Sequence, residues 1–165
     1  MDEELLSRQQ PQSLEAEQAV LGSILIDSRC ITEVVGVVKP EDFYLQQNRE
    51  IYETIYTMFN FSQTIDPVTV LDKLKELGYY HDNSRDYILQ LMEITPTAAN
   101  VVRYAGIVRD KAMLRGLGEA GTDIVEMVSE QVGTPSEMLE TAEKKIYALR
   151  KGERGDSLEH IGTIM

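Results

Sequence analysis

Hydrophobic residues recur along the chain at the spacing of helices rather than at the alternation of strands. The first such stretch begins after Ser13, whose hydroxyl can accept a hydrogen bond from the free N–H groups of a first helical turn. Glu15 and Glu17 follow near the positive end of the helix dipole, where carboxylates are stabilised. The pattern predicts an amphipathic helix with one buried face. That face consists of Val20, Leu21, Ile24 and Leu25.

Further short helices are predicted before residue 94. Ser28 is the expected cap of the next one, and Ser84 is expected to open the last. Asp66 precedes Pro67, which combines an N-cap acceptor with proline at the first helical position, and Gly78 suits the left-handed residue that ends a helix. The apolar faces expected in these helices are Ile31, Val34, Val35 and Val38; Ile51, Ile55, Met58 and Phe59; Leu71, Leu74 and Leu77; and Tyr87, Ile88, Leu91 and Met92.

Two longer helices are predicted in the second part of the chain. No proline occurs from Thr97 to Glu130, and apolar residues recur over roughly eight or nine turns, far beyond the usual helix length. Thr134 and Glu137 then form a capping box around Pro135. The helix that follows carries apolar residues at the three-four-three spacing of a coiled-coil seam. These residues are Leu139, Ala142, Ile146 and Leu149.

The predicted fold is all-α, with a compact helical head at residues 1–95 followed by an extended antiparallel helical hairpin at residues 96–151. The segment 152–165 is expected to begin a linker, because it opens with G-E-R-G at Gly152–Gly155. A two-helix hairpin cannot bury both faces of its helices, so we expect a partner to cover the exposed stripe. The expected self-association residues are Leu139, Ala142, Ile146 and Leu149, with the facing apolar residues of the longer helix.

Composition favours an aliphatic core in a protein of the cytoplasm. The 165 residues are 42% apolar, with seven methionines, three phenylalanines and no tryptophan. Cys30 is the only cysteine, so an internal disulfide is excluded, and its apolar neighbours predict a buried structural thiol. The N-terminus is acidic and lacks the order of a signal peptide, and no apolar run has the length of a membrane span. No membrane partner is expected.

The charge of the chain argues against DNA binding by this part of the protein. The formal net charge is −12, with 17 acidic and 7 basic residues before Thr95. Affinity for duplex DNA comes mainly from Lys and Arg side chains that displace counterions from phosphates. We therefore expect weak DNA binding, and an acidic surface that suits docking to basic proteins.

Several motifs suggest chemistry that the helical pattern does not support. The segment Gly116–Gly121 matches G-x-G-x-x-G, but it lies inside a helical pattern instead of following a strand, so close helix packing or a softened helix explains it better. No phosphate-binding loop for ATP occurs, and His81 and His160 lack metal-type neighbours. We expect no catalytic, cofactor or metal residues. The alternative is a small helical metal-dependent enzyme using Glu/Asp carboxylates, such as Glu15 with Glu17 or Glu41 with Asp42.

Four strings carry a resemblance to a known family. They are P-Q-S-L-E-A-E-Q-A-V-L-G-S-I-L-I-D at 11–27, P-E-D-F-Y at 40–44, I-D-P-V-T-V at 65–70 and P-T-A-A-N-V at 96–101. In this order they resemble the opening of the bacterial replicative DNA helicases of the DnaB family. The resemblance extends to about Arg150.

The resemblance implies a non-catalytic N-terminal domain that acts in assembly and docking. In the family, a helical head and hairpin precede a linker and a RecA-like ATPase motor, and six copies form a collar that is a trimer of dimers. The collar binds the helicase-binding domain of primase, and a helicase loader is a further candidate partner. ATP and Mg belong to the full-length helicase, as does DNA unwinding, and no cofactor is expected in this part.

The resemblance also places primase docking on particular residues. Two of these residues depart from the family pattern. Gly118 occupies a position where the family has a bulky apolar residue, and Tyr87 follows D-N-S-R-D where the family often has Gly-Gly. By motif alignment the docking positions are Glu15, Tyr87, Arg115, Gly118 and Ile124.

Overall fold

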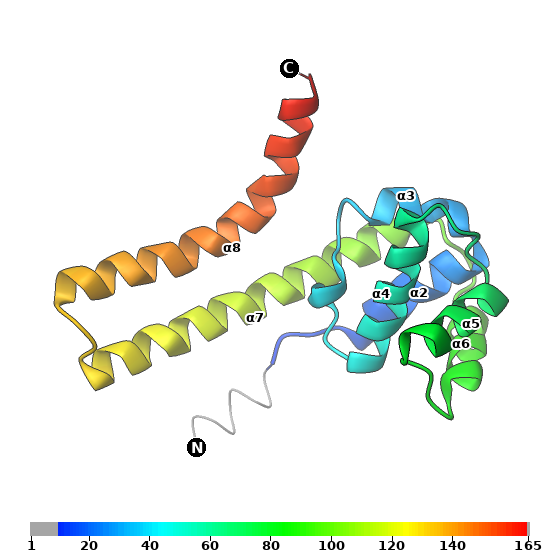
Figure 1. Cartoon of the computed structure of the whole chain (residues 1–165), viewed down its shortest axis with the longest axis horizontal. Helices are drawn as coiled ribbons and strands as arrows, with labels where there is room; N and C mark the ends of the chain where they lie inside the picture. Colours follow the sequence, from blue (N-terminus) through cyan, green and yellow to red (C-terminus); the bar gives the residue numbers. More distant parts are fainter. Residues whose placement is uncertain (1–9, 165) are drawn as a thin grey trace. The chain divides into compact units, whose positions relative to one another are not determined.

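A computed structural model describes residues 10–164, with side chains for residues 10–150, and every regular element in that range is helical (Figure 1). The all-α prediction is confirmed, since no strand occurs among these residues. The chain divides into two compact units, which we call the head (Pro11–Ala112) and the hairpin (Met113 onward). Each unit is described by itself.

The first helix of the head is α2 (Leu14–Ile26), and it begins as predicted. The hydroxyl oxygen of Ser13 accepts a hydrogen bond of 3.2 Å from the backbone N–H of Ala16. This bond satisfies one of the free donors of the first turn. The whole predicted face is buried, and it comprises Val20, Leu21, Ile24 and Leu25.

The segment after α2 differs from its prediction at the cap. A 3₁₀ turn, η1 (Ser28–Cys30), leads into the short α3 (Ile31–Val34) and later into η2 (Pro40–Asp42). Asp27 rather than Ser28 is the cap, because its carboxylate accepts from the backbone N–H of Arg29 at 3.2 Å and also binds the Arg29 guanidinium. Of the predicted apolar face, Ile31, Val34 and Val38 are buried and Val35 is half-buried.

Three further helices complete most of the head: α4 (Gln46–Asn60), α5 (Pro67–Leu77) and α6 (Ser84–Glu93). The carboxylate of Asp66 accepts from the Thr69 backbone N–H at 2.8 Å, and the Thr69 hydroxyl accepts from the Asp66 N–H at 2.9 Å. Gly78 ends α5 with a φ of 79°, in the left-handed region that favours glycine. Leu77, predicted to be buried, is exposed, because the buried face of α5 is formed by Val70 and Leu74.

The core of the head lies where α2 packs against α4 and α6. Tyr52 is fully buried, stacks on Phe43 with ring centroids 4.7 Å apart and donates its hydroxyl to the carbonyl oxygen of Val38 at 2.8 Å. This burial raises the pKa of Tyr52. The hydrogen bond to Val38 fixes the loop before η2.

The first turns of α7 (Val101–Glu130) belong to the head, so the head continues beyond residue 95. Val101, Ala105 and Val108 are buried in the head core, which explains why the unit boundary lies inside this helix. The helix begins at Val101 rather than at Thr97, whose hydroxyl caps a turn by accepting from the Ala99 N–H at 3.1 Å.

The last helix is α8 (Pro135–Ile164). Its backbone stays helical through residues 152–164, where the sequence suggested the start of a linker. Met165 lies outside the described residues.

Gly22 sets the distance between α2 and α6. A Cβ atom at this position would overlap the Thr95 hydroxyl and lie 2.5 Å from the backbone carbonyl oxygen of Leu91. Because a backbone atom cannot swing aside as a side chain can, only glycine fits here. In contrast, a Cβ at Gly106 in α7 would meet nothing within 4 Å.

We predict that Gly22→Ala destabilises the protein by about 2 kcal/mol, because overpacking against a backbone outweighs the gain of about 1 kcal/mol in helix propensity. Gly106→Ala is the matched control, since it has the propensity gain without the clash, and we expect it to be neutral or slightly stabilising. Urea unfolding followed by circular dichroism measures both. Equal unfolding midpoints for the two variants would contradict the close approach of α2 and α6.

Candidate functional site

The hairpin consists of the distal part of α7 and the antiparallel α8, joined by a short turn (Figure 1). The turn uses two left-handed residues, Gln131 with φ 52° and Gly133 with φ 84°. The Thr134 hydroxyl accepts from the Glu137 backbone N–H at 3.2 Å and donates to the Glu137 carboxylate at 3.3 Å. This cap starts α8 at Pro135, as the sequence predicted.

The two helices of the hairpin meet along a narrow seam of small residues. Ala120 is buried, and a Cβ at Gly116 would lie 2.6 Å from a methyl group of Leu149. Lys145 reaches across to Asp123 with an Nζ to Oδ2 distance of 3.2 Å. Small side chains allow the helices to approach closely, but they bury little apolar surface.

The predicted seam of α8 divides into two stripes. Ala142 and Leu149 are half-buried on the side that faces α7, whereas Leu139 is 65% exposed and Ile146 is 41% exposed. The half-buried stripe runs through Met138, Ala142, Lys145 and Leu149. Leu139 and Ile146 each follow a residue of that stripe by one position, which rotates them by about 100° around the helix. Among the residues of this unit whose side chains are described, nothing covers these two.

The facing part of α7 also leaves apolar side chains exposed. They lie three or eight residues apart, which places them on one face of the helix, as on the buried face of an ordinary amphipathic helix. They are Leu114, Leu117, Val125 and Val128.

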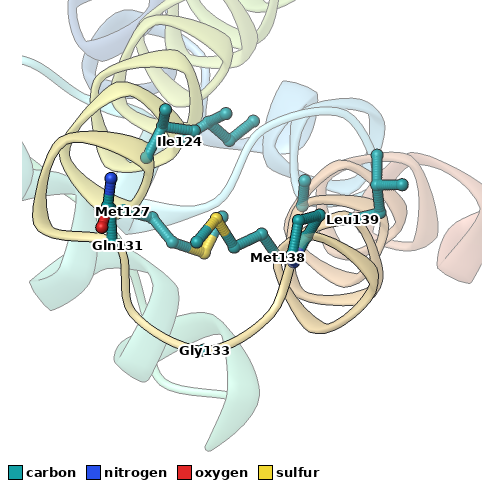
Figure 2. A pocket seen from close by; sticks show the side chains of 9 residues that line it. Ile124, Met127, Gln131, Gly133, Met138 and Leu139 are labelled. Carbon is teal, nitrogen blue, oxygen red and sulfur yellow. The ribbon is translucent and has the colours of Figure 1, made fainter.

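An apolar groove of about 560 Å³ lies between α7 and α8 next to the turn. Figure 2 shows Met127 and Met138 pointing toward one another from the two helices, with Ile124 and Leu139 also lining the groove. Methionine side chains are flexible and adapt to irregular partners. The other lining residues are Val128, Gln131, Gly133, Pro135 and Ala142.

The head contains a buried carboxylate, that of Glu17, with several hydrogen-bond donors around it. It accepts hydrogen bonds from the backbone N–H groups of Tyr44 at 2.7 Å and Leu45 at 3.3 Å, and from the Asn48 amide at 3.0 Å. Glu17 lies in the first turn of α2, as predicted, but it is only 1% exposed, so its carboxylate belongs to the core of the head. Glu15, two positions earlier, is exposed, since a two-residue step turns a helix by about 200°.

The network continues to Tyr87 on α6. The Tyr87 hydroxyl donates to the Asn48 side-chain oxygen and accepts from the Gln18 amide at 3.4 Å. Burial raises the pKa of Tyr87. Sequence reasoning missed Asn48, although it shares the helical register of the buried residues Ile51 and Ile55.

The predicted docking residues fall in both units. In the head, Glu15 and Gln18 line a hollow of about 280 Å³, and Gln18 binds Tyr87, so these residues form one neighbourhood.

The remaining docking positions lie on α7 in the hairpin. Arg115 is half-buried, Ile124 lines the apolar groove, and a Cβ at Gly118 would meet open space. Ile124 therefore shares its groove with Leu139 and Ala142, two of the predicted self-association residues.

The G-x-G-x-x-G string occupies the interior of α7 and follows helix, not a strand. Of its glycines, Gly116 packs against Leu149, as helix approach requires, whereas Gly118 and Gly121 face open space. The geometry of a dinucleotide-binding loop is absent here.

The candidate catalytic side chains have other contacts. Cys30 is buried, and burial raises its pKa to about 11. His81 lies on the surface with its Nε2 atom 2.9 Å from the Glu50 carboxylate, and Asp42 accepts from the Lys39 backbone N–H. His160 lies outside the described side chains. Within the described part of the chain, no three His, Cys, Asp or Glu residues gather to hold a metal ion, and no helix has the length and apolarity to cross a membrane.

Comparison with known proteins places these features in a family. The family model described as "DnaB-like helicase N terminal domain" matches residues 9–110. The Replicative DNA helicase DnaB of Leifsonia xyli is 36% identical over 143 residues, which cover 86% of this chain and 31% of that protein. The corresponding protein of Geobacillus stearothermophilus is 30% identical over 171 residues, covering 100% and 37%. The chain thus spans about a third of the length of these curated relatives.

A solved structure is also similar. The crystal structure of the N-terminal domain of DnaB helicase from Mycobacterium tuberculosis matches with a TM-score of 0.79 and 36% identity. The match covers 84% of this chain and 98% of that chain.

We predict that Glu17→Ala costs about 3 kcal/mol or more of folding free energy, because it leaves the buried Asn48 amide and two partly buried backbone donors without their acceptor. Glu15→Ala is the matched control in the same helical turn, and we expect it to cost less than about 1 kcal/mol. Chemical denaturation gives both values. Similar losses for the two variants would show that the Glu17 network does not hold the head together.

Proposed function

The chain belongs to the family of DnaB-like helicase N-terminal domains, and on this premise we propose that it is the assembly and docking domain of a replicative helicase. Its own role is non-catalytic. In the complete enzyme a RecA-like motor hydrolyses ATP with Mg and unwinds DNA in the cytoplasm. The curated relatives that carry the name replicative DNA helicase support this assignment.

The observation that carries the proposal is the uncovered apolar surface of the hairpin. Leu139 and Ile146 are exposed beside the groove that Ile124 and Met127 line. Covering apolar surface stabilises by about 25 cal/mol per Å², so a second hairpin laid on this face gains free energy that the single chain forgoes. Pairs formed in this way then assemble into a six-membered collar, as the family resemblance implies.

Primase docking follows from the same resemblance. The helicase-binding domain of primase is proposed to contact Glu15 and Tyr87 of the head, and Arg115 and Ile124 of the hairpin. Gly118 offers no side chain, so the contact that a bulky residue would make is missing from this version of the site. Because Ile124 also lines the self-association groove, pairing determines how much of it remains for primase.

Tyr87 has two separable parts in this proposal. Its hydroxyl is engaged inside the head by Asn48 and Gln18, which leaves the half-buried ring as the part that a partner can contact. A rigid aromatic ring is a common anchor of protein interfaces.

Because the chain is acidic, we propose that DNA is contacted only by the full-length helicase. A helicase loader is a further candidate partner.

We predict that Leu139→Asp and Ile146→Asp each weaken self-association on the order of a hundredfold, because an unpaired carboxylate in an apolar interface costs several kcal/mol. The control is Ala148→Asp, which makes the same charge change at an exposed position on another side of α8. Sedimentation across a concentration series measures the mass of each variant. A wild-type mass for Leu139→Asp, or equal losses in all three, would refute pairing through this face.

We predict that Tyr87→Ala and Arg115→Ala each weaken binding of the primase helicase-binding domain about thirtyfold, which corresponds to roughly 2 kcal/mol. Tyr87→Phe keeps the ring, so it is expected to bind primase normally while losing about 1 kcal/mol of stability with its hydroxyl bonds. Leu89→Ala, on the opposite side of α6, is the binding control. Isothermal titration calorimetry measures the affinity of each variant for the primase domain, after each variant has been shown to be folded. Wild-type affinity in folded Tyr87→Ala would remove Tyr87 from the docking surface.

A further inference from the structure

A second groove, of about 420 Å³, lies between α5 and α6 in the head. Ile88 is completely buried at its base, Leu71 is half-buried, and Val68 and Leu89 are exposed at its sides. We propose that this groove binds an amphipathic segment of a partner protein that carries carboxylates next to apolar side chains.

The apolar part of the groove supplies the anchoring surface. Val68 and Leu89 come from different helices, yet both remain in solvent beside the same hollow. Exposed apolar side chains scattered singly are ordinary, whereas a set that converges on a concave site is typical of binding surfaces. A groove between two helices suits a short segment that inserts one or two side chains.

The rim of the groove supplies the charge. Lys75 and Arg85 both line it, and among the described residues no carboxylate lies within 4 Å of either cationic group. The Lys75 Nζ atom lies 4.9 Å above the centre of the Tyr80 ring, which holds its charge at the edge of the hollow. Asp72 is the only carboxylate among the lining residues, so cations outnumber it two to one.

The local charge is opposite to that of the surrounding chain. Before Thr95 the sequence has 7 basic residues against 17 acidic ones, and two of the seven gather at this groove. A basic rim around an apolar base is complementary to a segment in which Asp or Glu flanks Leu, Ile or Phe. This complementarity selects an acidic partner segment.

A second copy of the chain is a poorer occupant. In a symmetric pair centred on this groove, Lys75 and Arg85 would meet the same cations of the other copy, and like charges oppose one another. The groove is also separate from the proposed primase surface, because Leu89 and Tyr87 are two positions apart on α6 and point about 200° from each other. The proposal therefore stands or falls independently of primase docking.

The test begins with a phage-displayed library of random 16-residue peptides selected on the full 165-residue chain, with the Arg85→Glu/Leu89→Ser double variant as the counter-selection. The most enriched peptide is then synthesised and titrated against wild type, Arg85→Glu and Lys39→Glu. Lys39→Glu is matched in net charge and lies outside the groove. Circular dichroism checks that each variant is folded.

We expect the enriched peptides to carry carboxylates beside large apolar residues. Their binding should shift the NMR signals of the backbone amides at Val68, Tyr80 and Leu89. Arg85→Glu should weaken peptide binding about tenfold or more, equal to about 1.4 kcal/mol. Lys39→Glu should bind within about twofold of wild type. The proposal is overturned if nothing is enriched over the counter-selection, if enriched peptides lack carboxylates, or if the shifts map to Ile124 and Met127. The proposal is also overturned if the Leu139→Asp variant still self-associates and the added substitution Arg85→Glu abolishes that self-association. This result would assign the groove to a second copy of the chain.

Discussion

The head depends on one buried carboxylate, that of Glu17. Burying an ionised group is costly unless hydrogen bonds replace its water, and here two backbone N–H groups and the Asn48 amide do so. These donors come from the start of α4 and the segment before it, so the interaction ties that region to α2. The side-chain oxygen of Asn48 in turn accepts a hydrogen bond from the hydroxyl of Tyr87, which lies on α6. The orientation of a proposed docking side chain is therefore set by the core of the head.

Among the hairpin residues whose side chains are described, no comparable buried polar network occurs. The inner seam of the hairpin is made largely of small residues such as Gly116, Ala120 and Ala142, together with an ion pair between Lys145 and Asp123. Much of its apolar surface lies outside this seam, on stripes that the described residues of this unit leave in solvent. A structure of this kind gains most of its stability from packing against another element. In the proposed function a second hairpin supplies this packing, and primase is proposed to use the part of the surface that pairing leaves accessible.

Features specified by neighbouring residues could be predicted from the sequence, and features specified by distant residues could not. The helix starts at Ser13, Asp66 and Pro135 follow from capping within a few positions, and they are confirmed. The cap at Ser28 was wrong because Asp27, one residue away, is a competing acceptor. The burial of Glu17 depends on donors that lie 27–31 positions later in the chain, which no local pattern reveals. Three-four-three spacing did not show that Leu139 and Ile146 would remain exposed while Ala142 and Leu149 are half-buried, because two adjacent stripes of α8 fit it equally well.

In the proposed function, Leu139 and Ile146 on α8 are covered by another copy of the chain. Hydroxyl-radical footprinting read by mass spectrometry tests it directly, because it reports the solvent access of individual side chains. As protein concentration rises, oxidation of Leu139 and Ile146 should fall together, while that of Phe61, which is 72% exposed in the head, should stay constant. Oxidation of the hairpin residues that does not change across the concentration range would contradict the account.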